Sequence, residues 1–198
     1  NKNEKTNDKD TGKILNNKSD YEKGEKRKDN TNLSTPTGEI SDACVLGDSN
    51  VKLVPNDSKK IDSIVAKVNG QEIANYAKSW LNQGLTYDFG SSMELKPGGH
   101  CDCSHFVYKV LMHFNLLKGG QIRSTVWGSC GVKGTVMYSS YDKLVPGDVV
   151  FKSFGNAVGH VEIYIGNGET IGCNSGRGVT HGHNAKAYTS FIHLTAYD

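Results

Sequence analysis

The strictest constraint on the fold is a stretch of alternating side chains that leads directly into a tight turn. Residues 160–166 alternate polar and apolar, so one face of the predicted strand is apolar and the other carries His160 and Glu162. Asn167-Gly168 comes next, and this dipeptide is typical of the two-residue turn of a β-hairpin. The sequence therefore predicts an antiparallel hairpin in which residues 169–174 form the returning strand.

Apolar spacing predicts helices before this hairpin and short strands around it. Residues with a helical period predict helices at 61–68, 73–81 (ending at Gly84) and 103–117. Short apolar runs predict strands at 149–151, 178–180 and 191–195, and the Gly-, Ser- and Thr-rich stretch 121–141 predicts a long loop with one short helix. Helices followed by an antiparallel β-meander indicate the α+β fold class, with the N-terminal helices packed on the meander.

The N-terminal quarter of the chain has a different composition. Residues 1–38 are rich in Lys, Asn, Asp, Glu and Thr, and such a segment buries too little apolar surface to offset the entropy of ordering. We therefore expect 1–57 to be a disordered linker or stalk and 58–198 to be the folded domain, although the more apolar 39–58 also suits packing along that domain. The chain begins with Asn and has no signal peptide or apolar run of roughly 20 residues, so we expect a fragment whose anchor lies upstream.

Charge and cysteine content exclude two classes of protein. The formal net charge is only +2, and nothing in the folded part forms the basic patch that a nucleic-acid partner requires. The five cysteines are too few for a disulfide scaffold in a domain of this size, and their odd number leaves at least one free thiol. We interpret Cys44, Cys130 and Cys173 as small buried side chains.

A candidate nucleophile lies where a glycine-rich segment gives way to an apolar helical pattern. Cys103 precedes Ser104 at the start of this pattern, and Asp102 and Ser104 both offer capping oxygens. A helix N-terminus favours negative charge and lowers the pKa of a thiol toward the reactive thiolate. The neighbouring His100, Cys101 and Cys103 lack the paired-ligand spacing of structural zinc sites, so we expect no metal.

A cysteine nucleophile needs a base and a third polar group that orients the base. His160 is the candidate base, with a packed or surface histidine as the alternative. Asn174 lies on the returning strand and offers an amide oxygen to the imidazole, whereas a turn-forming Asn is the alternative. His181 and His183 are weaker candidates for the orienting role.

Three motifs, in order, resemble the NlpC/P60 family of cysteine peptidases. Cys101-Asp102-Cys103-Ser104-His105-Phe106-Val107 resembles the family's Asp-Cys-Ser-Gly-Phe-Val signature. Leu144-Val145-Pro146-Gly147-Asp148-Val149-Val150-Phe151 and Gly159-His160-Val161-Glu162-Ile163-Tyr164-Ile165-Gly166-Asn167-Gly168 resemble its Pro-Gly-Asp strand and its His-Val hairpin. Together the motifs span roughly 61–195.

The resemblance implies a papain-like α+β domain that cleaves stem peptides of bacterial peptidoglycan, commonly at the γ-D-glutamyl to diamino-acid bond, without metal or cofactor. It implies Cys103 as nucleophile, His160 as base, and Tyr87 and Asp102 beside the substrate. In the register of phage-type members, Asn174 is the third member of the triad.

This chain departs from the family pattern at three positions. His105 replaces a Gly, Glu162 replaces a small residue although some phage-type members carry Glu there, and Gly172 stands where a polar third residue is common. Alternatives therefore stay open: an N-acetylmuramoyl-L-alanine amidase with the same triad, or a catalytically inactive wall-binding or assembly module. The expected location is outside a bacterial cell, secreted or tethered at the wall, and a phage lysin, a conjugation hydrolase and a host enzyme all fit.

Overall fold

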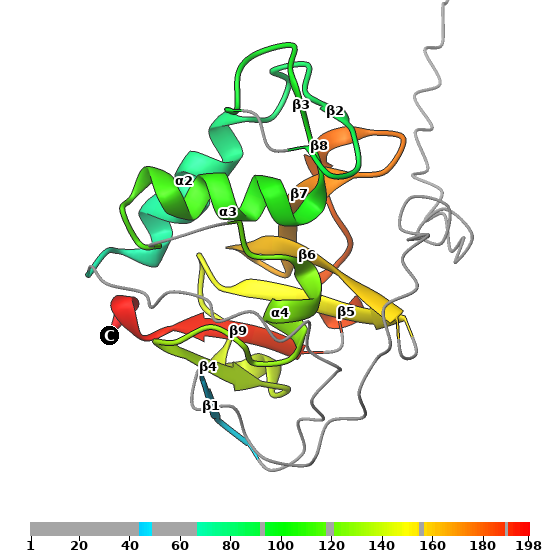
Figure 1. Ribbon diagram of the computed structural model, residues 1–198. Helices are drawn as coiled ribbons and strands as arrows, with labels where there is room; N and C mark the ends of the chain where they lie inside the picture. Colours follow the sequence, from blue (N-terminus) through cyan, green and yellow to red (C-terminus); the bar gives the residue numbers. More distant parts are fainter. Residues whose placement is uncertain (1–43, 49–66, 92–93, 118–120, 155–156, 189) are drawn as a thin grey trace, which may run out of the picture.

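The computed structural model describes residues 44–48, 67–91, 94–117, 121–154, 157–188 and 190–198, and a seven-stranded sheet forms its centre (Figure 1). The strands follow the order β1-β4-β9-β5-β6-β7-β8. Their bounds are β1 Cys44–Leu46, β4 Thr135–Tyr138, β5 Val149–Phe154, β6 Ala157–Gly166, β7 Glu169–Asn174, β8 Gly178–His181 and β9 Ser190–Leu194. Each neighbouring pair is antiparallel except β1 and β4, which run parallel.

Three helices pack on the middle of this sheet. Helices α2 (Gly70–Ser79), α3 (Cys103–His113) and α4 (Ser124–Gly128) all contact β6, and α3 also contacts β7 (Figure 1). Short 3-10 helices occur at η1 (Tyr141–Lys143), η2 (Ala185–Ala187) and η3 (Thr195–Tyr197). Helices that precede and cover an antiparallel meander confirm the predicted α+β fold class.

The hairpin that was predicted from alternation forms as expected. β6 and β7 pair antiparallel, with Ile163 opposite Ile171. The turn residues Asn167 and Gly168 both have positive φ values, 54° and 79°, which is the geometry of the tight hairpin turn that favours Asn-Gly. The hairpin therefore fixes the register of the strand that carries His160.

The start of β5 is tied to the end of the chain through a buried carboxylate. Asp148 is fully buried, and its oxygens accept from the backbone N–H of Val145 (2.9 Å) and contact His193 Nδ1 (2.8 Å). The other ring nitrogen of His193 lies 2.9 Å from Asp198 Oδ1. Burial raises the pKa of Asp148 to about 6, while its hydrogen bond to His193 raises the pKa of that imidazole to about 9. This chain of contacts joins β5, β9 and the last residue.

Cys44–Asp48 lie before the predicted domain boundary at residues 57/58 and pack on the folded domain, the alternative that was left open for 39–58. β1 extends the sheet as an edge strand, and Cys44 forms a disulfide with Cys130. Both side chains are buried, as interpreted from the sequence, but their pairing was not predicted. A three-residue strand with a distant parallel partner leaves no periodic signal in the sequence. The rest of the predicted linker, 1–43 and 49–57, lies outside the described residues.

Helix ends and one strand also differ from the predictions. α2 stops at Ser79 rather than near Gly84, because Asn82 already takes a left-handed conformation (φ 60°). α3 stops at His113 rather than at residue 117, and β4 lies within the stretch that was predicted to be a loop. The predicted helix at 61–68 falls largely outside the described residues. In the described part of the chain, no helix has the length and apolarity needed to cross a membrane.

Candidate active site

A short pair of parallel strands lies directly before α3. β2 (Thr86–Tyr87) pairs with β3 (His100–Cys101), which places Tyr87 beside Cys101 in register. The backbone N–H of Asp88 donates to the carbonyl of Cys101 (3.0 Å). Tyr87, predicted to lie near the nucleophile, is therefore adjacent in the sheet to the residue two before Cys103.

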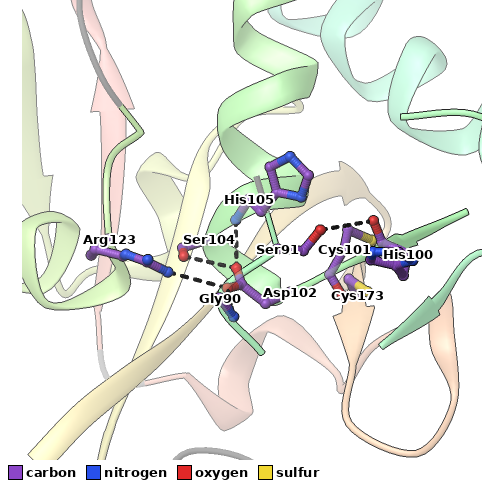
Figure 2. A network of polar contacts seen from close by, with 9 residues as sticks. All are labelled: Gly90, Ser91, His100, Cys101, Asp102, Ser104, His105, Arg123 and Cys173. Carbon is purple, nitrogen blue, oxygen red and sulfur yellow. Dashed lines mark hydrogen bonds and ion pairs between the residues drawn. The ribbon is translucent and has the colours of Figure 1, made fainter. Parts of the chain in front are cut away.

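Asp102 is the N-cap of α3 and the centre of a polar network (Figure 2). Its Oδ1 accepts from the backbone N–H of His105 (2.7 Å) and from the hydroxyl of Ser104 (2.9 Å). Its Oδ2 accepts from the backbone N–H of Gly90 (2.9 Å) and lies 3.2 Å from Arg123 Nη1. The side chain is only 2% exposed, so both oxygens are engaged inside the protein. The carboxylate fixes the first turn of the helix.

Cys103 is the first residue of α3 and is buried. In this position its backbone N–H belongs to the first turn, whose N–H groups have no acceptor within the helix. The positive end of the helix dipole favours a negative charge on the sulfur. The structure therefore places Cys103 at the predicted helix N-terminus, and its role as nucleophile stays a prediction.

The two other free cysteines in the described residues, Cys101 and Cys173, are also buried. Cys173 Sγ donates to the carbonyl of Cys101 (2.9 Å). Its hydrogen bond with Cys101 and its burial both raise the pKa of the Cys173 thiol, so it stays protonated. Within the described ranges, no cluster of three or more His, Cys, Asp and Glu side chains is arranged to hold a metal ion.

His160 lies on β6, the strand against which α3 packs, and it is 4% exposed. Its Nε2 is 3.0 Å from Oε1 of Glu162, which lies two residues further along the same strand and on the same face. The helix that carries Cys103 and the strand that carries His160 are thus in direct contact. The imidazole already has a polar partner.

Glu162 is a partner of His160 that was not predicted from the sequence. It is fully buried, and Oε2 accepts from the hydroxyl of Thr170 on β7 at 2.5 Å. Burial by itself raises the pKa of this carboxyl, but hydrogen bonds and attraction from His160, together with Thr170, lower it overall. The signal was present in the sequence, because strict alternation places residues 160 and 162 on one face.

Asn174, the predicted third residue, makes different contacts at the end of β7. Its Nδ2 donates to the carbonyl of Gly172 (3.2 Å) and to Thr180 Oγ1 on β8 (3.3 Å). At Nε2 of His160 the acceptor is Glu162 instead of Asn174, because the carboxylate reaches the ring from the same strand. An orienting role for Asn174 stays a prediction.

His105, the bulky replacement at the helix start, is fully buried. In Figure 2 its ring points away from Asp102, although its backbone N–H is bonded to that residue. The ring therefore packs into the interior. It does not extend to the protein surface beside Cys103.

A cysteine at a helix N-terminus, packed against a strand that carries a histidine with a carboxylate partner, is the kind of arrangement that cysteine hydrolases use. The family model for the NlpC/P60 family matches residues 84–195, more than half of the chain. This protein belongs to the NlpC/P60 family, whose members are cysteine peptidases and hydrolases. Membership supports a peptidoglycan hydrolase in general.

Comparison with solved structures gives distant likenesses. NlpC2 from Trichomonas vaginalis is 24% identical, with 66% of this chain and 48% of that chain covered and a TM-score of 0.49. NlpC1 from the same organism is 21% identical, with 68% and 47% covered and a TM-score of 0.48. The NlpC/p60 domain of the peptidoglycan hydrolase SagA is 24% identical, with 63% and 97% covered and a TM-score of 0.46. The chain thus spans about half the length of the two Trichomonas proteins, and no curated protein matches it.

Proposed function

We propose that this protein is a peptidoglycan endopeptidase that cleaves stem peptides at the γ-D-glutamyl to diamino-acid bond. The observation that carries the proposal is the contact between α3, which begins at Cys103, and β6, which presents the buried His160 with its carboxylate partner. NlpC/P60 membership over residues 84–195 supports peptidoglycan as the substrate class.

The reaction has two halves. His160 accepts the proton of the Cys103 thiol, and the sulfur attacks the peptide carbonyl to form a C–S bond. The Cys103 backbone N–H is the proposed donor to the oxyanion of the tetrahedral intermediate. The intermediate then breaks its C–N bond, and the amine leaves with the proton from His160. A water molecule, deprotonated by His160, finally attacks the thioester and releases the acid and the thiol.

Substrate contacts are proposed for Tyr87 and Asp102, which flank the nucleophile on β2 and at the helix cap. Asp102 already accepts hydrogen bonds from the backbone N–H groups of Gly90 and His105, which hold its carboxylate in place. A substrate amine would be a further donor to the same carboxylate. The guanidinium of Arg123, whose Nη1 lies 3.2 Å from Asp102 Oδ2, carries the opposite charge. The proposed partner is a peptidoglycan peptide outside a bacterial cell.

The test is digestion of defined muropeptides by the full chain, with mass spectrometry of the products. We expect fragments that end at the γ-D-glutamyl residue, and no such fragments from Cys103→Ala. Cys173→Ala is the matched control, since this buried thiol is expected to have no part in the chemistry. Release of intact stem peptides from the glycan would identify an amidase instead, and wild-type protein without products would identify a wall-binding or assembly module.

A further inference from the structure

The buried carboxylate of Glu162 is the feature that the proposed mechanism has not yet used. A fully buried negative charge is strongly unfavourable unless it is paired and hydrogen-bonded. Glu162 meets both conditions, since Oε1 lies 3.0 Å from His160 Nε2 and Oε2 accepts from Thr170 (2.5 Å). Its pKa is lowered despite its burial, so the carboxylate is charged at neutral pH.

Two glycines leave the space that this side chain occupies. A Cβ atom at Gly172 would overlap Cγ of Glu162, and a Cβ atom at Gly182 would overlap its Oε2. Gly172 lies on β7, the neighbour of β6, and Gly182 directly follows β8, the next strand in the sheet, so the backbone at both positions leaves room for the carboxylate. Neither glycine has a positive φ, and the space for Glu162 is therefore the reason the structure offers for glycine at these positions.

We propose that Glu162 is the positioning residue for His160, and that this protein takes its third polar group from the histidine's own strand. Gly172 stands where a polar third residue is common in the family. Here that position has no side chain, and the long side chain of Glu162 supplies the polar group instead. Glu162 accepts from Nε2–H and so fixes the tautomer in which Nδ1 carries the lone pair. Nδ1 is accordingly the atom that takes the thiol proton, and the carboxylate stabilises the resulting imidazolium.

The expected effect of Glu162 on catalysis rests on the proposed function. Its effect on the tautomer of His160 is tested without substrate. Nitrogen NMR of histidine-labelled full chain reports which ring nitrogen of His160 is protonated, with His160→Gln used to assign the signal. We expect Nε2–H in the wild type and in Glu162→Gln, whose amide oxygen still accepts. We expect loss of this preference in Glu162→Ala. An unchanged tautomer in Glu162→Ala would overturn the proposal.

Activity on muropeptides supplies the second measurement. We expect kcat to fall about 100-fold or more in Glu162→Ala and at least about 10-fold in Glu162→Gln, because the amide keeps the shape and loses the charge. A purely structural glutamate predicts wild-type kcat for the isosteric Gln variant, and that result would overturn the positioning role. If the wild type itself cleaves nothing, the proposed function fails while the NMR result still decides the position of the proton.

Moving the polar acceptor from residue 162 on β6 to residue 172 on β7 gives a rescue test. Gly172→Asn alone is expected to destabilise the protein, because its Cβ overlaps Glu162. In Glu162→Ala/Gly172→Asn the overlap is removed, and the new amide offers an acceptor from β7. We expect the double variant to recover at least about 10-fold of the kcat that Glu162→Ala loses. A double variant whose kcat is no higher than that of Glu162→Ala would contradict the claim that Glu162 replaces a polar group at position 172.

Discussion

Replacement of Asp102 by Ala tests whether the polar network in Figure 2 fixes the start of the nucleophile helix. The carboxylate accepts hydrogen bonds from two backbone N–H groups, of His105 and Gly90, and from the Ser104 hydroxyl. Loss of a helix N-cap costs about 1 kcal/mol, and each of the two further donors costs about 1–2 kcal/mol when it loses its charged acceptor. Arg123 is 37% exposed in its side chain and adds little.

The expected total for Asp102→Ala is therefore about 3–5 kcal/mol in the free energy of unfolding. Ser104→Ala is the matched control, because it removes one neutral donor from the same carboxylate and should cost only about 1 kcal/mol. Urea unfolding measures both, and with a slope of about 2 kcal/mol/M the Asp102→Ala midpoint falls by about 2 M. If Asp102→Ala is no less stable than Ser104→Ala, the network does not hold the helix start.

Two further predictions concern the disulfide of the edge strand β1 and the buried contact between His193 and Asp148. Cys44→Ala/Cys130→Ala opens a loop closed over a sequence separation of 86, and we expect urea unfolding to show a loss of about 2–4 kcal/mol; an unchanged midpoint would contradict this. The pKa of His193 is raised to about 9 by Asp148, so its contribution is fully present below about pH 6.5 and is lost as pH rises through 9. We expect the free energy of unfolding to fall by on the order of 1–3 kcal/mol between these values, and His193→Gln to flatten that slope. A wild-type stability that is flat from pH 6.5 to 9.5 would refute the pairing.

Local signals in the sequence were sufficient for the hairpin and for the start of α3. Alternation and Asn167-Gly168 specify β6 and β7 because register and turn are set by neighbouring residues. The capping oxygen of Asp102 specifies the first turn of α3 in the same way. The same local rules place Cys103 and His160 on elements that pack together in an α+β fold.

Non-local pairing explains what the sequence did not predict. β1 is three residues long and pairs with β4 in parallel, and cysteine spacing carries no information about which thiols meet, so the link from Cys44 to Cys130 was missed. The orienting group was sought across the hairpin, at Asn174, because a triad commonly draws on separate elements. Glu162 was treated as a departure from the family pattern, although its place on the same face as His160 follows from the strand period.

The most direct test of the central claim is to trap the covalent intermediate on Cys103. Full-length protein is mixed with a defined muropeptide, quenched in acid during turnover, and analysed by mass spectrometry after proteolysis. We predict an added acyl mass on Cys103, with fragment ions that separate it from Cys101, and no adduct in Cys103→Ala. An acyl adduct on another residue, or cleavage by Cys103→Ala at the wild-type rate, would contradict the account.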